Sequence, residues 1–134
     1  QGLERAGIKF DPALVVQGEF SFESGVRAAS ALLDLERRPS AVFAANDDMA
    51  AGVIRVALER NLRVPEDLSV CGFDDTPMSR QIFPALTTVQ QPTYEMGRIA
   101  TLELLASIRN PESGRMVRVP YALKLRQSTG PVQE

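Results

Sequence analysis

Residues 41–58, AVFAANDDMAAGVIRVAL, decide the fold. They begin with a continuous apolar run, Ala41 to Ala45, of the kind found in strands that are covered on both faces. Asn46 and Asp47 follow, and either side chain can accept a hydrogen bond from a free N–H in the first turn of a helix. Apolar residues then recur at helical spacing. The stretch therefore predicts a strand that passes directly into an amphipathic helix.

The same pattern occurs on both sides of this unit. Leu14–Gln17 predicts a short buried strand, and Ser21 can cap the helix that follows it. Leu68–Phe73 predicts a further apolar strand after Pro65. Strands that alternate with helices in this order are typical of an α/β fold, in which a parallel sheet carries helices on both faces.

The C-terminal third continues with less regular elements. Thr87–Gln90 predicts a short β-like run, and Pro92 suits the first position of a helix. That helix carries an apolar stripe between Met96 and Leu105. Val117–Leu125 alternates like a strand, but its central proline restricts the run to a sheet edge or a bend.

Composition excludes several classes of function. The 134 residues carry a formal net charge of -2, which does not suit a strongly basic nucleic-acid module. The sequence contains no histidine, so His-dependent triads and His-ligated metals are excluded, and we expect no metal and no cofactor. The single cysteine, Cys71, is predicted to be an unreactive buried thiol and fits a reducing, cytoplasmic location. No apolar run is long enough to cross a membrane.

Polar or aromatic residues follow three of the predicted strands, as Gly18-Glu19-Phe20, Asn46-Asp47-Asp48 and Asp74-Asp75. Ligands of open α/β sheets bind outside the carboxyl ends of the strands, so these junctions are predicted to share one crevice. An amide donates and accepts hydrogen bonds, a carboxylate accepts from two hydroxyl groups, and a phenyl ring is a flat apolar platform. This combination suits a sugar or the ribose of a nucleoside.

Each group also has a purely structural explanation. Asn46 and Asp47 are ordinary capping residues, and we interpret Asp47 in that way. Asp74-Asp75 can form a plain turn, and Phe20 can be a core residue. An enzyme or a phosphoreceiver is a further alternative, but the chain lacks a phosphate loop and a lysine at a further strand end.

Five stretches resemble regulators of the LacI/GalR (lactose-repressor/galactose-repressor) family, in order and at the proper spacing. They are GEFSFESG (18–25), RPSAVFAANDDMAAG (38–52), LRVPEDLSVCGFDD (62–75), PALTTVQQP (84–92) and Met96-Gly97. The resemblance covers almost the whole chain. It implies the periplasmic-binding-protein-like (type I) fold, of which this chain holds an incomplete two-lobed core.

The resemblance also implies roles for individual residues. Phe20 is similar to the aromatic residue that stacks on the effector, Asn46 and Asp74 to the residues that bind its hydroxyl groups, and Gln91 to a crevice residue near the hinge. Asp47, Asp48 and Asp75 look like structural caps or acids behind the site. Family homodimers pair through the second lobe, which by position implicates Ala51, Ile54, Arg55, Ile82 and Phe83.

The resemblance further divides the chain. Residues 1–86 correspond to the second lobe, 87–120 to a crossover segment that belongs to the first lobe, and 121–134 to the return and the C-terminal tail. The implied activity is non-enzymatic: a small-molecule effector changes the affinity for operator DNA, which is bound through a headpiece absent from this chain. The alternative is a periplasmic sugar-binding protein of a transporter, which shares the two-lobed fold.

Overall fold

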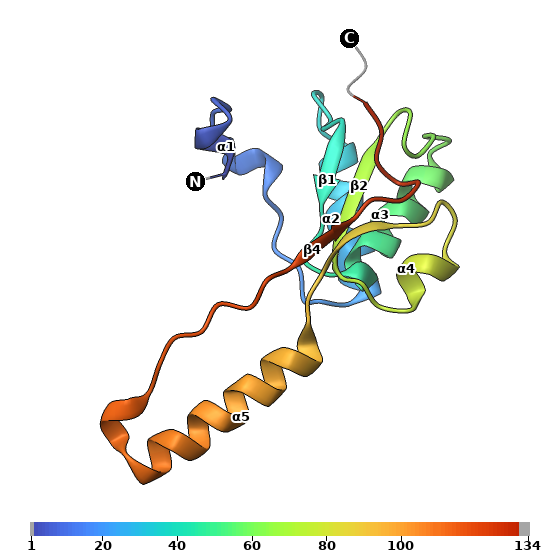
Figure 1. The fold of residues 1–134 in the computed structure, drawn as a ribbon. Coiled ribbons are helices and arrows are strands. Elements are labelled where there is room, and N and C mark those ends of the chain that lie inside the picture. The colour runs from blue at the N-terminus through green and yellow to red at the C-terminus, as the bar shows by residue number, and fades with distance from the viewer. Residues whose placement is uncertain (1, 132–134) are drawn as a thin grey trace.

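A four-stranded sheet in the order β1-β2-β3-β4 organises the molecule, of which a computed structural model describes residues 2–131 (Figure 1). Strands β1, β2 and β3 are mutually parallel, and β4 is antiparallel to β3. The strands are β1 (Ala41–Phe43), β2 (Ser69–Asp74), β3 (Thr87–Gln90) and β4 (Ala122–Lys124). The helices are α1 (Gly2–Arg5), α2 (Phe22–Leu33), α3 (Asp47–Glu59), α4 (Met78–Gln81) and α5 (Thr93–Arg109), with 3-10 turns at Pro12–Leu14 and Pro111–Ser113.

The core lies between one face of the sheet and the helices α2 and α3. Leu68, Val70 and Leu86 are fully buried there, against apolar residues of α3. Two glycines allow the helices to approach closely, because a Cβ at Gly25 would meet the carbonyl oxygen of Met49 at 2.3 Å and one at Gly52 would meet that of Phe22 at 2.5 Å. Helix α2 begins with the predicted Ser21 cap, whose hydroxyl accepts from the N–H of Ser24. The α/β fold predicted from the sequence is thus confirmed.

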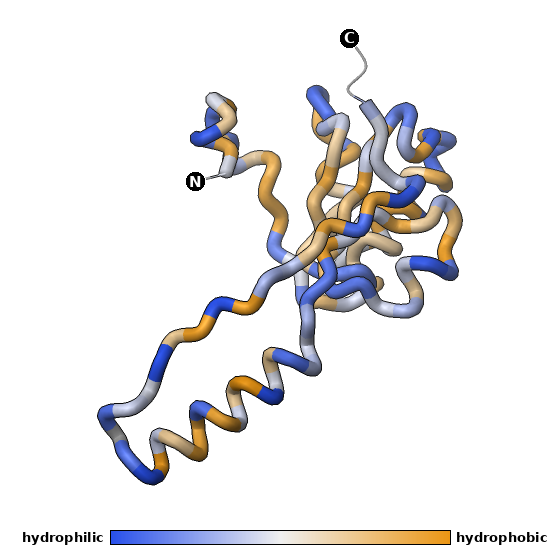
Figure 2. The backbone as a smooth tube through the Cα atoms, in the orientation of Figure 1, coloured by the Kyte–Doolittle hydropathy of each residue, from blue (hydrophilic) through white to orange (hydrophobic). Residues whose placement is uncertain are grey.

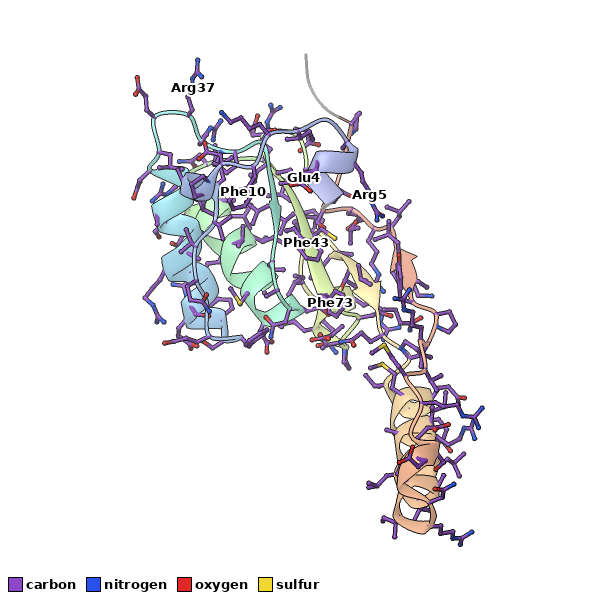
Figure 3. All side chains as sticks on the ribbon, turned by 90° about the vertical axis from the view of Figure 1, so that its left-hand side faces the viewer. Glu4, Arg5, Phe10, Arg37, Phe43 and Phe73 are labelled. Carbon is purple, nitrogen blue, oxygen red and sulfur yellow. The ribbon has the colours of Figure 1, made fainter. Side chains whose placement is uncertain are left out.

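The second face of the sheet is open, which corrects the expectation that its strands are covered on both faces. Phe43 is 65% exposed, and Phe73 lies on the same face of the neighbouring strand (Figure 3). Helix α1 buries none of its residues, so it does not cover this face. A continuous apolar run is typical of a strand whose two faces are both covered by helices. Among the described residues, helices pack on only one face of this sheet.

The predicted strand at Leu14–Gln17 is wrong. The segment begins with Leu14, the last residue of a 3-10 turn, and its side chains line a groove of about 400 Å³ together with residues of β1 and α2. Among the described residues, its backbone makes no hydrogen bond to β1. Three apolar residues are enough to place a segment against an apolar groove, but strand formation also needs a matched backbone register.

Helix α5 and the chain that returns from it project away from the sheet (Figure 1). None of the residues of α5 is buried, and hydrophobic residues recur along its whole length (Figure 2). Because Thr87–Gln90 forms β3 inside the sheet, the projecting segment begins at Gln91 rather than at Thr87. Pro92 is the N-cap of α5, one residue before the position predicted for it.

The ends of the chain agree with the sequence where they are described. Gly7 has a φ of +70° and follows α1, in the left-handed conformation in which glycine commonly terminates a helix. Predictions for Gln1 and for residues 132–134 lie outside the described part of the chain. Within residues 2–131, no helix has the length and apolar character needed to cross a membrane.

Candidate functional site

The carboxyl ends of the three parallel strands meet at one edge of the sheet, and three of the four predicted ligand residues stand there. Asn46 lies three residues beyond β1, Asp74 is the last residue of β2, and Gln91 directly follows β3. Gln91 donates from Nε2 to Oδ1 of Asp74 at 2.6 Å. The structure therefore brings Asp74 and Gln91 into direct contact.

Asn46 connects this edge to the loop that carries the fourth predicted ligand residue. Its Oδ1 accepts from the N–H of Met49 at 2.9 Å, so Asn46 is the cap of α3. Its Nδ2 donates to the carbonyl oxygen of Phe20 at 3.0 Å. Phe20 itself is 66% exposed, so it is not a core residue. Both polar groups of the Asn46 side chain thus have partners, and they join the start of α3 to the loop that carries Phe20.

Two of the predicted ligand residues have an unusual backbone conformation. Phe20 has a φ of +56° and Asp74 a φ of +114°, in a region that non-glycine residues rarely adopt. Such conformations cost about 1–3 kcal/mol each and persist only where the surrounding contacts fix them. They are common at ligand sites, where the strain orients a side chain.

Asp47 is not a cap, which corrects our interpretation of it. Its side chain is fully buried and accepts three hydrogen bonds. The donors are the N–H of Thr76 at 2.7 Å, the hydroxyl of Thr76 at 3.0 Å and the hydroxyl of Thr88 at 2.6 Å. A buried carboxylate requires such donors, since an unpartnered one is very unfavourable. Asp47 therefore joins the start of α3 to the loop after β2 and to β3.

Asp75 also turns inward, rather than forming a plain exposed turn. Its side chain is almost wholly buried and forms an ion pair with Arg126. It also accepts from the hydroxyl of Ser79 at 3.2 Å and from Nε2 of Gln90 at 3.0 Å. Burial acts to raise the pKa of Asp75, but the hydrogen bond and charge of Arg126, with the Ser79 hydroxyl and Arg80, outweigh it and hold the pKa below its ordinary value.

The lowered pKa of Asp75 gives stability a pH dependence of known sign. A carboxyl group whose pKa is lower in the folded state stabilises the fold above its unfolded pKa of about 4, and that contribution is lost as the pH falls towards the folded pKa. We expect the free energy of unfolding to fall between pH 5 and pH 3, and to fall less steeply in Asp75→Asn. Urea unfolding at several pH values measures this. Asp34→Asn, at a surface pair with Arg60, is the control and should keep the wild-type slope. Equal slopes for Asp75→Asn and the wild type would contradict the prediction.

The four predicted ligand residues do not share an enclosed cavity. Gln91 lines a space of about 670 Å³ between the open sheet face, α5 and residues 115–121, and Phe20 lines the groove beside α2. Neither cavity includes Asn46 or Asp74. The edge is therefore an open surface of hydrogen-bonding groups, with one aromatic ring at its border.

The residues predicted for a dimer interface lie around one apolar groove of about 360 Å³. All five line it, together with Phe22, Leu58, Glu59 and Met78. Ala51 and Ile54 are buried and form its floor, whereas Arg55 is exposed and Phe83 is 80% exposed. Ile82 is partly buried against the core. Of the five, Phe83 and Arg55 thus offer the most surface to a second chain.

Sequence reasoning missed the residues that support the edge from behind, which are Thr76, Ser79, Thr88 and Arg126. Arg126 lies 51 positions from Asp75, and Thr88 lies 41 positions from Asp47. No local pattern marks these pairs, because ordinary threonine, serine and arginine residues acquire the role only through the sheet register. Within the described residues, no group of three or more cysteine and acidic side chains could hold a metal ion.

An open parallel sheet, with helices packed on it and polar side chains grouped at the carboxyl ends of its strands, defines an α/β domain of the ligand-binding class. Residues 1–129 match the family model of the periplasmic binding protein-like domain. The chain is 37% identical to catabolite control protein A of Priestia megaterium, over 96% of this chain and 39% of that protein. It is 45% identical to the HTH-type transcriptional repressor CytR of Escherichia coli K12, over 85% of this chain and 33% of that protein.

A solved structure of a regulator is also similar to this chain. The LacI family transcriptional regulator of Enterococcus faecium, with bound ribose, superposes with a TM-score of 0.81 at 34% identity and covers 98% of this chain and 48% of its own. The chain belongs to the periplasmic-binding-protein-like domain family, in the form found in LacI-family regulators. It spans less than half the length of these relatives. The similarity to named transcriptional regulators favours a regulator over a transporter protein.

Proposed function

We propose that the chain is the effector-binding and dimerisation part of a LacI-type transcriptional regulator that senses a sugar or a related metabolite. The observation that carries this proposal is the contact of Asp74 with Gln91 at the carboxyl edge of the sheet, the edge where Asn46 also follows its strand. Carboxylate and amide groups suit vicinal hydroxyl groups. The relative from Enterococcus faecium holds ribose, a ligand of the same chemistry.

Each predicted ligand residue then has one task. Asp74 accepts hydrogen bonds from two hydroxyl groups of the sugar. Asn46 and Gln91 exchange hydrogen bonds with the neighbouring hydroxyl groups, and Phe20 packs against the C–H face of the sugar. No nucleophile or base takes part, so the activity is binding rather than catalysis. The protein acts in the cytoplasm, where operator DNA lies, and binds it through a headpiece outside this chain.

The effector acts by favouring one of two arrangements of the lobes. Residues 1–86 belong to the second lobe, residues 87–120 are the crossover segment, whose projecting part from Gln91 packs on the first lobe, and the chain returns to the second lobe from residue 121. The exposed apolar residues along α5 support this division, since such a surface is unfavourable in water unless it is covered. The coupling between effector and operator can be no larger than the effector's differential affinity for the two arrangements.

The dimer forms through the groove around Phe83. A large exposed aromatic residue beside an apolar groove is typical of an interface. In a two-fold dimer, the same groove occurs on both chains, so each Phe83 can enter the groove of the other.

A thermal-shift screen of the full-length protein against sugars, sugar phosphates and nucleosides tests the proposed function. At about 100 times its dissociation constant, a ligand raises the free energy of unfolding by about 2.7 kcal/mol. We expect one class of sugar-containing ligand to raise the melting temperature clearly. No shift with any of these classes would contradict the assignment of a sugar effector.

A further inference from the structure

We infer that Arg126 is a positioning residue for the effector site: it holds Asp75 and thereby fixes the strained turn that presents Asp74. This inference rests on the proposed function and extends it. Arg126 follows β4 and is more than 50 positions from Asp74 in the sequence, and it would touch no effector itself. It acts through the protein, from behind the edge that carries the ligand residues.

Arg126 contacts three separate segments behind the edge of the sheet. Its side chain is mostly buried, and Nη2 forms the ion pair with Oδ1 of Asp75. Nη1 donates to the carbonyl oxygen of Leu86 at 2.7 Å and to the hydroxyl of Ser79 at 3.1 Å. The planar guanidinium group offers several donors in a fixed geometry, so one side chain joins the loop after β2, the start of α4 and the entry to β3.

The turn that these contacts fix is the one that carries Asp74. Asp74 has a φ of +114° and Asp75 a φ of +57°, so two successive non-glycine residues are strained. The N–H of Asp75 donates to the hydroxyl of Thr88, and its carboxylate accepts from Arg126, Ser79 and Gln90. These contacts lock Asp75, and Asp74 has little freedom once its neighbour is locked. Loss of Arg126 removes the strongest of them.

The ion pair of Arg126 and Asp75 also connects the proposed ligand site with the segment that leaves the sheet towards α5. Gln90 donates to Asp75, and the next residue, Gln91, donates to Asp74. Two neighbouring carboxylates therefore hold two neighbouring amides at the exit of the chain towards α5. Arg126 lies where the chain has returned along β4, so Asp75 contacts both the outgoing and the returning part. A change in how this projecting segment is seated therefore reaches Asp74 by two routes, directly through Gln91 and through Gln90, Arg126 and Asp75.

The test uses the full-length protein and ribose as the probe. Arg126→Met alone leaves a buried carboxylate without its partner and can prevent folding, so the double variant Asp75→Asn/Arg126→Met is measured as well. Ser128→Ala is the matched control, because Ser128 is fully buried in the same segment and accepts from the N–H of Thr87 while its hydroxyl donates to the carbonyl oxygen of Val70. It supports the sheet at a distance from Asp74.

Two readouts separate positioning from stability. Amide hydrogen exchange of the peptide that covers residues 73–77 needs no ligand, and calorimetry gives the affinity for ribose. We expect the double variant to exchange at least tenfold faster in this peptide and to lose at least tenfold in affinity, while Ser128→Ala stays within twofold on both. Compared with Arg126→Met, the variant Arg126→Lys should have a higher melting temperature but no higher affinity for ribose. One ammonium group cannot reach all three acceptors of Arg126, which lie on Asp75, Ser79 and Leu86.

Unchanged exchange and affinity in the folded double variant would overturn the inference, and so would an equal loss in Ser128→Ala. If the wild-type protein binds no ribose, that result counts against a ribose effector, and the exchange rate at residues 73–77 decides the role of Arg126 by itself. The two failures are thus distinguishable.

Discussion

Replacement of Asp74 by alanine in the full-length regulator is expected to abolish the response to the effector while operator binding remains. The carboxylate of Asp74 stands at the end of β2 with Gln91 on one oxygen. A hydrogen bond to a charged group contributes about 1.5–3 kcal/mol, so losing two of them lowers the affinity for the effector by at least about a hundredfold. The measurement is operator binding by fluorescence anisotropy, with and without a ligand found in the thermal-shift screen.

Two further variants show whether the loss of the effector response in Asp74→Ala comes from the missing carboxylate or from a change in the backbone. Asp74→Gly tolerates a φ of +114° without strain and lacks the carboxylate, so it should lose the response as alanine does. Asp67→Ala removes an acid just before the opposite end of β2, where it pairs with Arg63, and should keep the response. A normal response in Asp74→Gly would show that the carboxylate does not bind the effector. Loss of operator binding in Asp74→Ala would point to a structural role.

The second large effect is expected from Phe83→Asp, which should convert the proposed dimer into monomers. Phe83 is 80% exposed and borders the groove over Ala51 and Ile54. A central aromatic residue contributes at least about 2 kcal/mol to an interface, and an aspartate there would bury an unpaired charge. The dimer dissociation constant should rise by at least about a hundredfold. Sedimentation equilibrium over a range of protein concentrations measures it.

Phe83→Leu is the matched control, because it keeps an apolar side chain at the same place and should raise the dissociation constant only slightly. Since Phe83 is exposed in the single chain, neither substitution should lower the melting temperature of the monomer appreciably. An unchanged mass for Phe83→Asp would place the dimer interface elsewhere on the molecule.

The place of the predicted ligand residues at the edge of the sheet follows in part from the sequence, but their surroundings do not. Asn46 and Asp74 follow two strands that the apolar pattern predicts, and parallel topology brings those strand ends to one edge. Gln91 was indicated only by the family resemblance, and it directly follows β3 at the same edge. Which of two neighbouring polar residues caps α3 depends on side-chain geometry, and the structure assigns the cap to Asn46 and the buried network to Asp47. The sequence offers two equivalent capping residues, so it cannot distinguish them.

Local sequence patterns are sufficient to predict the α/β class, the strand–helix unit that begins at Ala41–Ala45, the Ser21 cap and the family to which the chain belongs. These depend on local periodicity, on capping and on motifs of adjacent residues. Only the tertiary structure decided that Leu14–Gln17 forms no strand and that one sheet face is open. It also decided that Arg126 supports Asp75. Each of these outcomes depends on register and contact between segments far apart in the chain, and the free energy of such contacts is not encoded in any local pattern.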